Sequence, residues 1–137
     1  MTIHLRAFVA GFASTLLFHQ GLLQLLHLAG AFPRAAWNMA PVPPLGVPAV
    51  LSLAFWGGLW GIGLWWLLRR QTGARRWVWA TVWGALLPSA VALFVVFPLK
   101  GQPVAGGFDP LLIVGALLLN GAWGFGVALL MRLMGQK

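Results

Sequence analysis

The stretch Val50–Leu68, VLSLAFWGGLWGIGLWWLL, holds nineteen residues without one ionisable side chain. A transmembrane α-helix needs about 20 consecutive, mainly apolar residues to cross the hydrocarbon core of a bilayer. Three further stretches meet this requirement: Ala7–Leu28, Trp77–Phe97 and Leu111–Met131. None of the four alternates apolar and polar residues as the strands of an outer-membrane barrel do. The sequence therefore predicts an all-α integral membrane protein with four transmembrane helices.

The composition of the whole chain agrees with this prediction and excludes several classes of protein. Of its 137 residues 61% are hydrophobic and 7% charged, whereas a soluble domain carries roughly 25% charged residues. The absence of cysteine excludes disulfide scaffolds, cysteine-ligated zinc sites and iron–sulfur clusters. A single acidic residue, Asp109, excludes paired-carboxylate catalysis and carboxylate-rich calcium or magnesium sites. With no nucleotide motif and no Ser–His–Asp relay, we expect no enzyme activity, no metal and no cofactor.

The basic residues predict the orientation of the helices. Seven of the nine bracket one side of the predicted spans, and Arg34 and Lys100 lie on the other. By the positive-inside rule, both termini and the short basic loop are cytoplasmic, in a multi-pass protein of the inner (cytoplasmic) membrane. We expect anionic lipid headgroups, rather than nucleic acid, to be the partners of the loop cations. These cations are Arg69, Arg70, Arg75 and Arg76.

The first span also resembles a secretory signal peptide. Met1–Ala31 has a basic start, an apolar core and small residues at its end. We expect the segment to be retained as the first transmembrane helix.

The chain divides into two helical hairpins. Residues 1–68 form the first, with a proline-rich outer loop at 32–48; residues 69–76 form the basic cytoplasmic loop; residues 77–137 form the second hairpin, with a glycine-rich outer loop at 98–110. Proline restricts the backbone, which predicts a stiff, extended first loop. The glycines predict a more flexible second loop.

The two hairpins resemble each other in sequence. The pattern GxWGxGxxxLxR begins at Gly58 in the second span and at Gly121 in the fourth, an offset of 63. The first and third spans align at an offset of 70, which pairs Arg6 with Arg76 and Ala10 with Ala80. We interpret this as a tandem duplication. Two hairpins that enter the membrane in the same direction are related by a pseudo-twofold axis along the membrane normal.

The glycines and several tryptophans predict how the helices pack. Small residues let helix backbones approach closely in lipid. We expect packing contacts at Gly57, Gly58, Gly61, Gly63, Gly121, Gly124 and Gly126. Four tryptophans inside the spans are expected to lie between helices: Trp56, Trp60, Trp83 and Trp123.

Polar side chains within the spans mark the candidate site, because a polar group in hydrocarbon is costly without a partner. Gln20, Gln24 and His27 share one helical stripe, and His19 lies about 18 Å along the helix from Ala7, near mid-bilayer. The candidate solute path or polar site comprises Thr15, His19, Gln20, Gln24, His27 and Asn120. Simple structural roles stay open for several of these: an interfacial residue for His27, a hydrogen-bonded neutral imidazole for His19, and interhelical bonding for Asn120.

Three functions remain open at this stage. The first is a homo-oligomeric channel or uncoupled transporter for a small neutral or anionic solute, lined by the polar stripe. The second is a non-catalytic accessory or assembly subunit of a larger membrane complex. The third is a haem protein that uses His19 across a dimer, since all three histidines lie on or before the first span.

Overall fold

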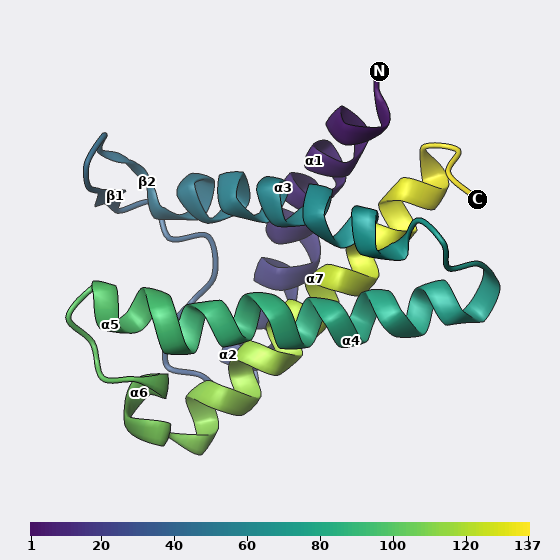
Figure 1. Ribbon diagram of the computed structural model, residues 1–137. Coiled ribbons are helices and arrows are strands. Elements are labelled where there is room, and N and C mark those ends of the chain that lie inside the picture. Colours follow the sequence, from purple (N-terminus) through teal and green to yellow (C-terminus); the bar gives the residue numbers. More distant parts are fainter.

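The computed structural model describes residues 1–137, and its long elements are all helical (Figure 1). The only strands form a two-stranded antiparallel ribbon, with two residues in each strand, in the proline-rich loop (32–48). In chain order the elements are α1 (Ile3–Ser14), η1 (Thr15–His19), α2 (Gln20–Leu28), β1 (Pro41–Val42), β2 (Val47–Pro48), α3 (Ala49–Leu68), α4 (Gly73–Val91), η2 (Ala92–Val96), α5 (Phe97–Leu99), α6 (Ala105–Phe108) and α7 (Pro110–Leu133). The segments η1 and η2 are π-helical turns.

These elements join into four continuous helices that are each long and apolar enough to cross a membrane, as expected of a multi-pass membrane protein. They run over Ile3–Leu28, Ala49–Leu68, Gly73–Leu99 and Pro110–Leu133. Each extends by one or more residues beyond the apolar stretch that predicted it, and two of them begin at a side-chain cap. The Thr2 hydroxyl accepts a hydrogen bond from the Leu5 amide, and the Asp109 carboxylate accepts one from the Leu111 amide.

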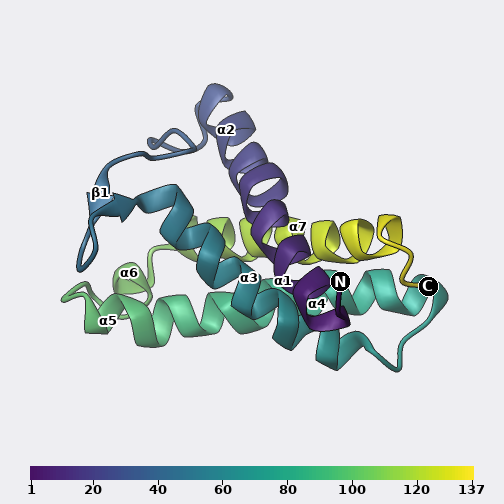
Figure 2. The same ribbon diagram turned by 90° about the horizontal axis from the view of Figure 1, so that it is seen from above.

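The helices pack chiefly as α1 against α3 and α4 against α7, and the two pairs meet where α1 contacts α7. Both termini and the α3–α4 connection lie at one end of the molecule, and the other two loops lie at the opposite end (Figures 1 and 2). Helix α2 leans away from α4 and α7 (Figure 2). It therefore depends on the proline-rich loop for much of its cover.

The buried core lies where α1, α3, α4 and α7 meet. It is built from small residues and a few large side chains: Ala7, Ala10, Leu64, Trp65, Leu68, Ala80, Trp123, Val127, Ala128 and Met131. The packing prediction is confirmed for Trp123, which is 3% exposed, and is wrong for Trp56, which is 58% exposed. Trp56 lies on a face of α3 that the other helices leave exposed. The residues around Trp56 are apolar on all sides of the helix, so the sequence could not show which face would be covered.

Glycines allow the closest helix contacts. A Cβ built at Gly61 would lie 2.5 Å from the Ala7 carbonyl oxygen and 2.9 Å from the Gly11 Cα. A Cβ built at Gly124 would meet the Ala80 carbonyl oxygen and the Gly84 Cα. Side chains cover four other glycines: Thr15 meets Gly57, Phe8 meets Gly58, Thr81 and Ala85 meet Gly121, and Ser14 and Phe18 meet Gly126. Gly57 also meets the backbone of α1 at the Gly11 carbonyl.

Gly63 departs from the packing predicted for it. No atom lies within 4 Å of its Cβ position, and the residue is exposed. It borders a small cavity between α3, α4 and α7 and takes no part in the contact that Gly61 makes with α1.

The contacts also correct the predicted alignment of the first and third spans. Ala7 and Gly11 contact Gly61 as Ala80 and Gly84 contact Gly124. This pairing places the first and third spans at an offset of 73, whereas the second and fourth keep the offset of 63. The predicted offset of 70 is therefore wrong for these contacts. That offset was chosen from residue identities, and in a mostly apolar sequence many identities arise by chance. The small residues that touch the partner helix give the alignment of the contacts.

Candidate functional site: a cleft under the proline-rich loop

Three polar side chains of the first long helix, Gln20, Gln24 and His27, hold the proline-rich loop in place. The Gln20 side-chain oxygen accepts a hydrogen bond from the Trp37 amide at 2.8 Å, and the Gln24 side-chain oxygen accepts one from the Ala36 amide at 3.0 Å. Gln20 is only 5% exposed. The two glutamines lie one turn apart on α2, so they meet successive amides of a loop segment that runs beside the helix.

The π-helical turn η1 adds a third attachment point. The Trp37 indole Nε1 donates to the Leu16 carbonyl oxygen at 2.9 Å. A π-helical turn alters the regular i→i−4 bonding, and such turns are frequent at functional sites. Trp37 adopts a positive φ of 55°, a conformation that non-glycine residues rarely adopt. Its amide and its indole both bond to the first long helix, which holds it there.

Two of the three histidines of this helix, His19 and His27, are held by different partners. The Gln20 amide nitrogen lies 3.0 Å from His19 Nδ1 and, because an amide nitrogen only donates, His19 Nδ1 accepts. His27 Nδ1 lies 2.8 Å from the Phe32 carbonyl oxygen and donates to it. His27 therefore fastens the start of the proline-rich loop to the end of α2.

The remaining predicted site residues lie apart from this group. The Thr15 hydroxyl donates to the Gly11 carbonyl at 2.9 Å, within its own helix. The Asn120 amide donates to the Ser89 hydroxyl at 2.9 Å and so joins α7 to α4. The structure thus brings together His19, Gln20, Gln24 and His27, but not Thr15 or Asn120.

Ser14 forms a second buried connection that the sequence did not single out. Its hydroxyl donates to the Trp123 carbonyl at 2.6 Å, and the Trp123 indole donates to the Gly11 carbonyl at 3.0 Å. These bonds join α1 to α7 at the centre of the molecule. No buried side-chain nitrogen or oxygen lacks a hydrogen-bond partner.

A cleft of about 470 Å³ opens where the loop meets α2 and the beginning of α3. The polar residues Gln20, Arg34 and Asn38 line it together with the apolar residues Leu23, Val50 and Leu53. We call it the Gln20 cleft. The remaining lining residues are Ala35, Ala36 and Ala49. Sites for small molecules commonly have volumes of about 300–1,000 Å³ and combine apolar walls with a few polar groups.

Arg34 gives this cleft an uncompensated positive charge. The chain contains nine Lys and Arg residues but only one acidic residue. That residue, Asp109, caps α7 through its contact with the Leu111 amide. Arg34 is exposed and makes no side-chain hydrogen bond within the protein. From the sequence, Arg34 was predicted only as part of the charge asymmetry that sets the topology. Its position as the lone cation of the proline-rich loop is the signal that could have placed it at the site.

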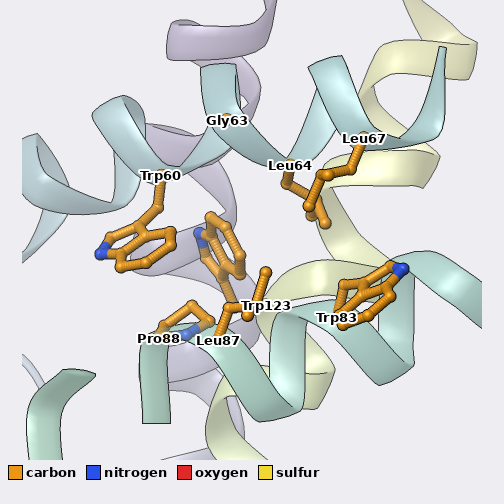
Figure 3. Close-up of a pocket in the computed structure, with 8 residues that line it drawn as sticks. All are labelled: Trp60, Gly63, Leu64, Leu67, Trp83, Leu87, Pro88 and Trp123. Atoms are coloured by element: carbon orange, nitrogen blue, oxygen red, sulfur yellow. The ribbon is translucent and has the colours of Figure 1, made fainter. Parts of the chain in front are cut away.

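A second, smaller cavity of about 100 Å³ lies between α3, α4 and α7 and is apolar (Figure 3). The indole rings of Trp60 and Trp123 lie beside each other at one side of it, and Trp83 lies at the other (Figure 3). Its lining contains no charged residue. It is a packing gap between the two helix pairs, and its lining has no charged group with which to bind a ligand.

No group of three or more His or acidic side chains gathers in a way that could hold a metal ion. Searches for similar proteins found no family model, no curated protein and no solved structure that matches this chain. The chemistry of the Gln20 cleft is therefore the basis on which a function is assigned.

Proposed function

We propose that this protein is a homo-oligomeric channel or uncoupled transporter that passes a small neutral or anionic solute, with the Gln20 cleft as the outer end of the solute path. The observation that carries the proposal is the cleft itself. It combines the unpaired Arg34 cation with the Gln20 and Asn38 amides above apolar side chains. The smaller cavity between α3, α4 and α7, in contrast, has no charged or amide side chain in its lining.

The groups at the cleft favour neutral or anionic solutes over cations. Arginine donates several hydrogen bonds and carries a permanent positive charge, and amide groups both donate and accept. Positively charged residues are the usual lining of anion pores, whereas cation pores use rings of acidic residues. The only acidic residue, Asp109, lies outside the cleft. A carboxylate-coupled proton step is therefore not part of the proposal.

A path across the membrane needs more than one copy of the chain. All residues that line the Gln20 cleft come from α2, the proline-rich loop and the start of α3. None comes from α1, α4 or α7, so the cleft reaches into only one end of the molecule. We infer that faces of a second copy complete the path.

The proposed setting is the inner membrane, with both termini and the α3–α4 loop in the cytoplasm. Three arginines at that end lie over tryptophan rings: Arg69 is 4.3 Å from the Trp66 ring centre, Arg76 is 5.0 Å from Trp65, and Arg132 is 6.0 Å from Trp77. Tryptophan and arginine together are typical of the membrane interface. With Arg70 and Arg75 exposed beside them, these residues fit contact with anionic lipid headgroups.

We further propose that the two hairpins arose by duplication and are related by a pseudo-twofold axis along the membrane normal. The matching contacts of Gly61 and Gly124 with the preceding helix of their own hairpin support this relation. Parallel repeats of this kind build the two halves of some transporters. The first hairpin differs by its anchored proline-rich loop, which places the cleft in that half alone.

A specific observation favours an accessory or assembly subunit as the second candidate function. The buried polar side chains of the bundle all find partners within the chain, and Gln20 and Gln24 bond to the proline-rich loop rather than to an open path. A rigidly held loop can also serve as a surface for a partner protein. This function would need no solute path.

Flux through liposomes that contain the purified protein tests the proposal. We expect passage of urea, glycerol or small anions above that of empty liposomes, and a reduction of anion flux in Arg34→Gln. The matched control is Lys100→Gln, which removes another exposed cation outside the cleft. Absence of flux for every solute, together with co-purification of defined membrane partners, would overturn the proposal in favour of the subunit function.

A further inference from the structure

The Gln20 cleft is amphipathic. A site for a simple inorganic ion would not need the apolar part of its lining. Its charged and amide groups, Arg34, Gln20 and Asn38, come with a hydrophobic lining of Leu23, Val50 and Leu53. A volume of about 470 Å³ is many times the roughly 30 Å³ that one water molecule occupies. The cleft therefore has room for an acidic group together with an apolar one.

From this geometry we propose that the Gln20 cleft binds an amphiphilic anion, an alkyl carboxylate whose acidic head contacts Arg34 and whose chain lies on Leu23, Val50 and Leu53. This inference rests on the proposed function and names the class of its solute. The guanidinium group of arginine matches a carboxylate with two parallel hydrogen bonds.

Two features of the surrounding structure favour an anion at this place. No carboxylate of the cleft competes for Arg34, since Asp109 caps α7 and lines no part of the cleft. The twenty-residue helix α3 begins at the cleft, where Ala49 and Val50 line it. The positive end of the helix dipole adds to the field of Arg34.

The apolar side of the cleft gives the alkyl chain a route toward lipid. Leu53 is 41% exposed on the surface of α3, so the hydrophobic lining continues onto the face of a helix that is apolar enough to lie in a bilayer. An alkyl chain on Leu53 could thus extend from the cleft along α3. A small inorganic anion would leave Leu23, Val50 and Leu53 without a role in binding.

Photocrosslinking of the full-length protein in neutral detergent tests the inference. The probe is dodecanoate that carries a diazirine on its chain, and the labelled peptides are identified by mass spectrometry. We expect labels on peptides that contain Leu23 or Val50–Leu53, and about tenfold less labelling there in Arg34→Gln, the size expected for loss of a charged hydrogen bond. Lys100→Gln is the matched control and should label like the wild type.

Two further arms make the result decisive. A dodecanol probe with the same diazirine should label the cleft weakly; equal labelling by the alcohol and the acid would overturn the proposal, as would cleft labelling that persists in Arg34→Gln. Competition by phosphatidylglycerol but not by unlabelled dodecanoate would assign the cleft to a bilayer lipid and overturn the assignment to an alkyl carboxylate.

The crosslinking experiment tests this inference independently of the flux experiment, because crosslinking measures binding and does not require transport. Specific labelling without flux would leave the site standing and overturn only the proposed function. Flux without specific labelling would leave transport standing and overturn only this inference.

Discussion

Gln20 connects three parts of the molecule through one side chain. Its oxygen accepts the Trp37 amide, its nitrogen donates to His19, and the residue also lines the cleft beside Arg34. A polar side chain that is 95% buried needs such partners, because an unpaired polar group away from water destabilises the folded state. In this protein the partners belong to a loop, so the same bonds that satisfy Gln20 also shape the cleft.

Replacement of Gln20 by leucine should therefore loosen the loop as well as the helix. We expect Gln20→Leu to lower the free energy of unfolding by about 1–3 kcal/mol, since it leaves the Trp37 amide without its acceptor. Hydrogen exchange at the Ala36 and Trp37 amides should accelerate, as measured by mass spectrometry in detergent. Gln102→Leu, at an exposed loop residue, is the control. Unchanged exchange in Gln20→Leu would show that the loop is held without Gln20.

At the scale of elements, each helix pair is built around glycines that face each other across the contact. Gly61 on α3 meets the backbone of α1 at Ala7 and Gly11, and Gly124 on α7 meets the backbone of α4 at Ala80 and Gly84. Close backbone approach is the means by which helices associate where lipid supplies no hydrophobic drive. Two residues further along α3, Gly63 faces open space. A glycine pattern thus marks a close contact only on the face where the partner helix lies.

This contrast gives a matched pair of substitutions on one helix. Gly61→Ala should lower the free energy of unfolding by about 1–3 kcal/mol, because the new methyl group would overlap the Ala7 carbonyl and force α1 and α3 apart. Gly63→Ala meets no atom and should leave stability unchanged or raise it by up to about 1 kcal/mol through helix propensity. Unfolding in mixed micelles measures both. Equal effects of the two substitutions would contradict the assigned contact.

At the scale of the whole molecule, the termini and the loops lie in two groups at opposite ends of the helices. The termini and the α3–α4 connection lie together, and the two longer connections lie at the other end (Figures 1 and 2). Four long helices joined by three connections produce this arrangement if successive helices alternate in direction. The basic residues concentrate at the end that holds the termini, which is the end that the positive-inside rule assigns to the cytoplasm.

Cysteine labelling in whole cells tests this orientation cleanly, because the natural chain has no cysteine. A cysteine at Leu45, 83% exposed in the proline-rich loop, should react with a membrane-impermeant maleimide added outside. A cysteine at Thr72, exposed in the α3–α4 connection, should react only after the membrane is permeabilised. The reverse pattern would invert the topology and move the Gln20 cleft to the cytoplasmic face.

The sequence by itself determined the number, place and kind of the long helices, because hydropathy over about 20 residues is a local property that does not depend on neighbouring segments. It also identified the polar residues of the first helix as the unusual ones. Only the tertiary structure decided what those residues do. Gln20 and Gln24 bond to amides of a loop twelve or more residues further along the chain, and the loop's path is not encoded in the helical pattern. The same holds for the Gly11–Gly61 contact and for Arg34 at the cleft, because the rotation and crossing of whole helices determine which residues meet.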